Sequence, residues 1–232
     1  MQYFLFELKL IGRSRRLKQM LLPFYFFIFQ YYYFCIIPSD GIPYKSLLMI
    51  FFMYGIISFP GALYSQFIFS SEGNFIDKLT VAPFPVYRLL NTKYYLYCFF
   101  ALITMVIMLP SFLLGIKLTE ILSAFLFAVG TMYFSFFQSA RYNFKSLDIK
   151  ATKYYNWQGF SFMGQWFVPI FSLFISIGVI VLIYQMLGKN IALLFMSITG
   201  IAFIATNKFW LKSIARSFEK TRYRRLEYFR EK

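Results

Sequence analysis

Long apolar stretches separated by short polar segments dominate the pattern of this 232-residue chain. A helix that crosses the hydrocarbon core of a bilayer needs about 20 mostly apolar residues. Six stretches meet this requirement, so the pattern predicts an all-α membrane protein with six transmembrane helices. The second stretch contains Pro60 and Gly61, which predicts a kink inside that helix. The predicted spans cover approximately residues 21–37, 46–69, 94–114, 121–140, 163–188 and 191–206.

The basic residues are distributed very unevenly among the segments that connect these spans. Lys45, Lys117 and Lys189 lie in the three short connections on one side, and the other 21 of the 24 Lys and Arg residues lie on the opposite side. Cytoplasmic segments of membrane proteins are enriched in Lys and Arg. The asymmetry therefore predicts that both termini are cytoplasmic and that the cytoplasmic face offers most of the surface for partners.

An amphipathic segment precedes the predicted bundle. Phe4, Leu8, Ile11 and the stem of Arg15 share one face of a helix within residues 1–20, with basic residues around them. This pattern predicts an interfacial helix at the membrane surface. It acts either as a flanking anchor or as a functional elbow helix.

A second amphipathic segment follows the last predicted span. Residues 208–232 predict a basic cytoplasmic helix, with Leu211, Ile214, Ala215 and Phe218 on one side. This pattern fits an anchor on the membrane surface better than a nucleic-acid site. The chain is therefore interpreted as one transmembrane domain, 1–232, made of the N-terminal helix (1–20), the six-helix bundle (21–207) and the tail helix (208–232).

Composition supports a membrane protein and excludes several kinds of chemistry. Hydrophobic residues make up 59% of the chain and charged residues 14%, against about a quarter charged in soluble domains. The absence of His excludes imidazole catalysis, and the two Cys residues lie near opposite predicted faces, too far apart for a disulfide. No phosphate-binding loop occurs, and the predicted spans contain no Asp, Glu, Lys or Arg. We expect no catalytic, metal or cofactor site on this chain, so any ATP-driven step would need another subunit.

The connection between the second and third spans carries the most informative pattern. Phe75, Ile76 and Leu79 recur at helical spacing, and Pro83 and Pro85 end this short segment. A short amphipathic helix that projects into the cytoplasm can dock in a groove of a partner protein. The alternative is a loop that lies on the membrane surface.

This connection resembles the coupling loop of type-2 ATP-binding-cassette (ABC) exporter permeases. An acidic residue and Gly follow the second span, a Leu-x-x-x-Pro pattern comes next, and Lys opens the third span. The N-terminal helix is similar to the elbow helix of these permeases, and the basic, aromatic tail resembles uncharacterised Bacteroidetes-type members. By this resemblance, the coupling-loop positions are Glu72, Gly73, Phe75, Leu79, Pro83 and Lys93.

The resemblance implies a membrane subunit of an exporter in the bacterial cytoplasmic (inner) membrane. Such a permease forms the substrate path as a homodimer or with a similar permease, among membrane lipids. It is driven by a separate cytoplasmic ABC ATPase that holds ATP and Mg, and nucleic acid is not an expected partner. These permeases often carry re-entrant helices between the fifth and sixth spans. Here Gly188-Lys189-Asn190 leaves little room, so a re-entrant piece would have to lie around residues 169–176.

Two other classes of function fit the same sequence. One is a membrane scaffold or assembly factor whose basic cytoplasmic face holds a partner. The other is a lipid scramblase or channel that works without ATP. The aromatic, uncharged interior suits lipids, hydrophobic peptides and amphiphilic drugs alike, so the sequence does not identify a substrate.

Overall fold

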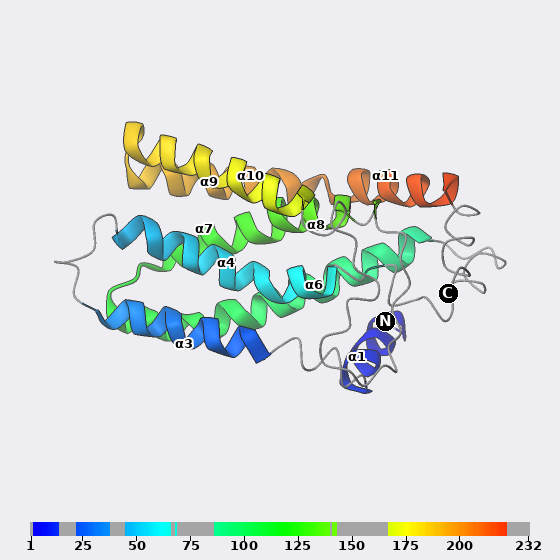
Figure 1. Cartoon of the computed structure of the whole chain (residues 1–232), viewed down its shortest axis with the longest axis horizontal. Helices are drawn as coiled ribbons and strands as arrows, with labels where there is room; N and C mark the ends of the chain where they lie inside the picture. The colour runs from blue at the N-terminus through cyan, green and yellow to red at the C-terminus, as the bar shows by residue number, and fades with distance from the viewer. Residues whose placement is uncertain are drawn as a thin grey trace.

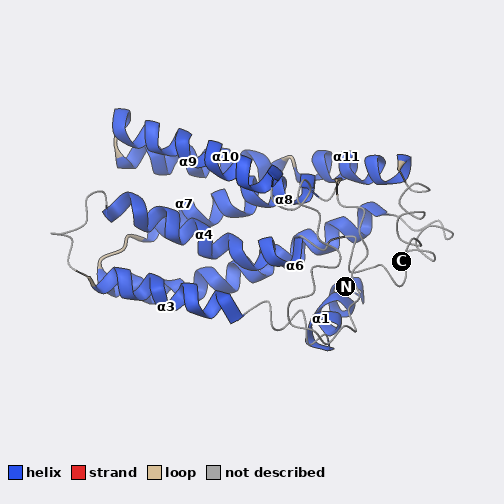
Figure 2. Ribbon diagram, in the orientation of Figure 1, coloured by secondary structure: helices blue, strands red, loops and turns tan. Residues whose placement is uncertain are grey.

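The described part of the chain is helical throughout. The computed structural model describes residues 2–13, 22–37, 45–65, 68, 86–139, 141–142 and 167–221, and Figure 2 shows these residues as helices with short connections. The all-α class predicted from the sequence is confirmed for these residues. Helices run side by side along the long axis of an elongated bundle (Figure 1).

Six helical rods correspond to the six predicted apolar stretches. Four are uninterrupted α-helices, the third ends in a 3₁₀ turn, and the fourth contains a π-helical turn. The rods are α3 (Leu22–Ile36), α4 (Lys45–Ser65), α6 (Val86–Met108) with η3 (Leu109–Leu114), α7 (Leu118–Phe127) with η4 (Ala128–Met132) and α8 (Tyr133–Ser139), α9 (Val168–Leu187), and α10 (Lys189–Ala205).

Three of these rods are long and apolar enough to cross a membrane, judged by length and composition. They are Val86–Leu114, Leu118–Ser139 and Ile170–Leu187. The pair formed by α10 and α11 (Asn207–Lys220) qualifies as a fourth span if it counts as one helix bent by 54°. Apolar helix also covers Phe24–Ile36 and Lys45–Gly61, both shorter than a full span. The helices are consistent with a membrane protein.

The third rod begins earlier than the sequence predicted. Its helix starts at Val86, directly after Pro85, and not near residue 94. The helix extends beyond the predicted span because Arg88 and Lys93 lower the local hydropathy without interrupting the helix. The fourth rod also begins slightly before its predicted span, so that Glu120 lies in the first turn of α7.

Glycine permits the closest helix contacts in the core. A Cβ atom added at Gly130 would lie 2.4 Å from the Gly200 carbonyl oxygen, and one at Gly200 would lie 2.4 Å from the Leu126 carbonyl oxygen. Small residues allow the backbones of membrane helices to approach in this way. A Cβ at Gly61 would lie 2.2 Å from the Tyr133 ring. These contacts fix α10 against α7 and η4, and α4 against α8.

The fifth and sixth rods form a tight hairpin. Gly188, with a φ of +87°, is the only residue between α9 and α10. Pro169 lies in the first turn of α9, where the missing N–H costs no helical hydrogen bond, and the helix continues unbroken to Leu187. A re-entrant piece around residues 169–176 is therefore ruled out by the continuous helix.

The two flanking helices lie at the same end of the bundle (Figure 1). α1 (Gln2–Arg13) packs against α6, and its predicted apolar residues Phe4, Leu8 and Ile11 contact the core. α11 packs against α6 and α8. Its predicted stripe, Leu211, Ile214, Ala215 and Phe218, is buried together with Trp210. The expectation that this stripe lies on the membrane surface is wrong, because the bundle itself covers the stripe.

Candidate functional site

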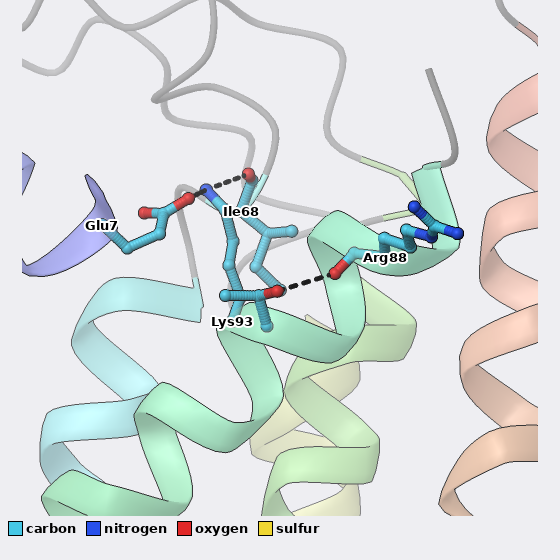
Figure 3. Close-up of polar contacts among 5 residues, drawn as sticks. Glu7, Ile68, Arg88 and Lys93 are labelled. Atoms are coloured by element: carbon cyan, nitrogen blue, oxygen red, sulfur yellow. Dashed lines mark hydrogen bonds and ion pairs between the residues drawn. The ribbon is translucent and has the colours of Figure 1, made fainter. Parts of the chain in front are cut away.

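A buried lysine joins three segments at the end of the bundle that carries α1. Lys93, on α6, lies with its Nζ atom 3.4 Å from the Glu7 Oε1 atom of α1. The same Nζ atom donates a hydrogen bond of 2.9 Å to the Ile68 carbonyl oxygen, just after α4. Figure 3 shows Lys93 between these two partners. We call this arrangement the Lys93 junction: Glu7, Ile68 and Lys93.

The junction is shielded from solvent. The side chains of Lys93 and Glu7 are 3% and 7% exposed, and Ile68 is 1% exposed. Two unlike charges attract strongly in such a low-dielectric site, but each has lost its hydration. The pair is favourable while both charges are present, and removal of one is costly because the remaining buried charge loses this contact. The junction therefore holds α1, the end of α4 and α6 in one fixed arrangement.

The local sequence explains why the lysine points inward. On α6, Leu89, Leu90 and Lys93 are buried, whereas Arg88 is exposed. The Thr92 hydroxyl donates to the Arg88 carbonyl oxygen at 2.9 Å, a bond within the same helix. Figure 3 shows Arg88 directed away from the junction. One helix thus presents one cation to the interior and another to the surface.

Aromatic packing positions the acidic partner. Phe4 of α1 and Phe99 of α6 make an edge-to-face contact, with ring centroids 5.9 Å apart. Phe4 and Glu7 are three residues apart, so they lie on the same face of α1. The ring contact therefore directs Glu7 toward α6.

The structure places one of the six predicted coupling-loop residues. Lys93 lies two turns inside α6, where it is part of the junction. The sequence reasoning did not identify Glu7, because no local pattern pairs residues that are so far apart along the chain. The predicted basic, amphipathic character of residues 1–20 was the nearest signal. Glu72, Gly73, Phe75, Leu79 and Pro83 lie outside the described residues.

A family model matches residues 2–232, nearly the whole chain, and its description is a family of unknown function, DUF5687. The chain belongs to this family. No curated protein and no solved structure matches it. The residues of this DUF5687 chain and their geometry are therefore the evidence for its function.

The opposite end of the DUF5687 bundle contains a second ion pair. Lys189 Nζ, at the start of α10, lies 2.8 Å from Glu120 Oε1 in the first turn of α7. The Glu120 side chain is 4% exposed and that of Lys189 is 32% exposed. An acidic group in the first turn is also favoured by the helix dipole. This pair connects two adjacent rods and leaves Lys189 partly accessible.

Hydroxyl groups connect the middle of the bundle around the π-helical turn η4. Thr131 Oγ1 donates to the Phe127 carbonyl oxygen at 2.6 Å, and Ser135 Oγ donates to the Thr131 carbonyl oxygen at 3.0 Å. The Ser135 and Ser172 hydroxyls are 2.5 Å apart and link α8 to α9. The first two bonds lie within the fourth rod, whereas the Ser135–Ser172 contact is of the kind that stabilises pairs of helices in membrane proteins. No group of metal-binding side chains occurs among the described residues of this DUF5687 chain.

Proposed function

We propose that the chain is the transmembrane permease subunit of an ABC exporter, with six spans and both termini in the cytoplasm. It forms the substrate path with a second copy or a similar permease. A separate cytoplasmic ATPase supplies the energy. In this proposal the end that carries α1 and α11 faces the cytoplasm, and the end with Lys117 and Lys189 faces outward.

The Lys93 junction is the observation that carries the proposal. The connection between α4 and α6 begins near Ile68, whose carbonyl oxygen accepts a hydrogen bond from Lys93, and Lys93 also binds Glu7 of α1. A force on that connection would therefore act on α1 and α6 together. A permease driven by a separate ATPase needs such a mechanical link between its docking loop and its spans.

In this proposal the Lys93 junction acts during the cycle of ATP binding and hydrolysis by the ATPase. ATP binding would bring two ATPase subunits together and move the docked connections. The Lys93 junction would transmit this movement to α1 and α6, and the bundle would shift between inward-facing and outward-facing populations. The chain itself supplies no hydrolytic group in this scheme. Its contribution is the path and the transmission of movement.

Affinity purification of the full chain from its native membrane tests the proposal. We expect an ATP-binding subunit to co-purify, ATP hydrolysis to require that subunit, and the chain alone to be inactive. Glu72→Lys combined with Phe75→Asp and Leu79→Asp should abolish recovery of the subunit. The matched control Lys117→Glu, at the other end of the bundle, should not affect it.

The alternatives give different results in the same preparation. Stoichiometric recovery of a protein that does not bind ATP would contradict the exporter and support a scaffold. Lipid scrambling by the purified chain alone in liposomes would support a scramblase. Unchanged recovery of the ATPase by the triple variant would place the docking surface elsewhere.

A further inference from the structure

A row of exposed basic residues follows the outer face of α11. Lys208, Lys212, Arg216 and Lys220 recur every four residues, and all four are exposed. Residues four apart lie on neighbouring positions of one helix face. Glu219 is the only acidic residue of this helix. In the part of the chain that the structure describes, none of the four is in an ion pair.

The row continues onto α6. Lys212 Nζ lies 5.8 Å from the centroid of the Tyr87 ring, and the next residue, Arg88, is exposed. We call these five residues the basic stripe: Arg88, Lys208, Lys212, Arg216 and Lys220. The stripe spans two helices that are held together by a buried apolar contact, so its charges occupy fixed positions.

Contacts between α11 and its neighbours show which way the stripe runs. The Trp210 ring packs against the Tyr94 ring at 5.4 Å between centroids, whereas Lys212 reaches Tyr87, seven residues nearer the start of α6. Arg141, after the end of α8, donates a hydrogen bond of 2.9 Å to the Ser213 hydroxyl. α11 therefore runs toward the start of α6 and past the end of α8, and its last turns extend beyond both.

Helix lengths allow this region to lie outside the hydrocarbon layer. The part of the third rod after Lys93 comprises 15 α-helical and six 3₁₀ residues (Tyr94–Leu114). It is about 34 Å long, enough to cross a hydrocarbon core of about 30 Å without the residues before it. Tyr87 then lies about 10 Å beyond the start of that crossing part. Arg216 and Lys220 follow Lys212 by about 6 and 12 Å along the axis of α11.

This placement favours a protein partner over lipid headgroups. The headgroup region adds only about 5–7 Å to each side of the hydrocarbon core. The attraction of anionic lipids for basic residues falls off within a Debye length of about 8 Å. The far half of the stripe extends past that range. Most apolar residues of α11, which an interfacial helix would insert into the membrane, are buried in the bundle, and Phe209, which is 78% exposed, is the exception.

We propose that the basic stripe is a second docking surface for the cytoplasmic ATPase subunit and that the ATPase meets it with an acidic face. This inference rests on the proposed function. α11, which carries four residues of the stripe, lies at the same end of the bundle as α1, which carries Glu7 of the Lys93 junction (Figure 1). Complementary charge on the two proteins would speed their encounter and fix their relative orientation, beyond what the loop between α4 and α6 provides.

Zero-length carbodiimide cross-linking of the complex in native membranes gives a direct test. The reagent joins an amine to a carboxylate that contacts it. We expect mass spectrometry to find Lys212 or Lys220 joined to an Asp or Glu of the ATP-binding subunit. Absence of any such link, in a sample where that subunit co-purifies, would overturn the inference.

Binding of the purified ATPase to the chain in nanodiscs gives the second test. The variant Lys212→Glu, Arg216→Glu, Lys220→Glu should weaken binding about tenfold or more, since like charges then face each other. Lys117→Glu is the matched control and should bind like the wild type. If the reversed variant does not fold, the same three positions changed to Gln should still weaken binding and reduce its salt dependence. Binding within twofold of the wild type would overturn the inference.

The outcomes separate this inference from the proposed function. Failure of the wild-type chain to recover an ATP-binding subunit would reject the proposed function before any variant is made. Normal ATPase binding by the reversed variant would reject only the second docking surface. The rate at which Lys212 and Lys220 are acetylated in nanodiscs without the ATPase tests whether lipid headgroups bind the stripe. Slower acetylation in phosphatidylglycerol than in phosphatidylcholine would assign the stripe to the membrane and overturn the inference.

Discussion

Lys93 Nζ lies 3.4 Å from Glu7 Oε1, although 85 residues separate the two in the chain. Both side chains are shielded from solvent, and the lysine also donates to the Ile68 carbonyl oxygen. A buried pair with these partners is more useful as a positional constraint than as a source of stability, because desolvation offsets much of the attraction. The pair fixes where α1 lies on α6, and the hydrogen bond to Ile68 holds a residue of the following connection at the same place.

Removal of one charge at the Lys93 junction should destabilise the protein. We expect Glu7→Gln or Lys93→Met to cost about 3–5 kcal/mol, because the remaining charge stays buried and loses this contact. The double variant Glu7→Gln, Lys93→Met should lose much less than the sum of the two. Thermal unfolding in detergent measures the difference. Arg88→Gln, on the exposed face of the same helix, is the control, with a change within about 0.5 kcal/mol. Additive losses in the double variant would show that the two residues do not interact.

The contact between α10 and the fourth rod should not tolerate an added methyl group. Gly130→Ala and Gly200→Ala each place a Cβ 2.4 Å from a backbone oxygen of the neighbouring helix, so the helices must separate. We expect each to cost about 1–3 kcal/mol. Gly178→Ala on α9 meets nothing within 4 Å and serves as the control, since alanine is otherwise the better helix former. Equal melting temperatures for all three variants would contradict the observed packing.

A buried tyrosine hydroxyl should contribute measurably to helix association. Tyr133 OH on α8 donates to the Tyr97 carbonyl oxygen of α6 at 3.0 Å. We expect Tyr133→Phe to lose about 0.6 kcal/mol, the average for hydrogen bonds between membrane helices. Tyr95→Phe removes a hydroxyl from a residue that is 51% exposed and should leave stability unchanged. The two variants are compared by unfolding in the same detergent, and a larger loss for Tyr95→Phe would reject the assignment.

The proposed orientation is testable by cysteine labelling in intact cells. In a chain with Cys35 and Cys98 replaced by Ala, Lys117→Cys should react with a membrane-impermeant maleimide. Lys212→Cys should react only after the membrane is opened. Both lysines are exposed, so access to the correct side of the membrane decides the result. The opposite pattern would invert the proposed orientation.

The sequence alone determined the helical class and the approximate position of each rod. This was possible because apolar runs of helical length and the grouping of Lys and Arg are local or additive properties of the chain. The same reasoning found the apolar faces of α1 and α11, since residues three and four apart share a helix face. It placed the start of the third rod too late, because hydropathy registers charge and not backbone hydrogen bonding.

The tertiary structure decided what each face and each charge contacts. Helical spacing identified Leu211, Ile214, Ala215 and Phe218 as one stripe, but only packing shows that α6 and α8 cover it and leave the basic stripe exposed. The family resemblance led us to expect Lys93 in the coupling loop. Its burial beside Glu7 depends on how α1 packs against α6, which only the structure shows. Periodicity describes one helix at a time, and a pair of side chains from distant segments meets only when the helices pack.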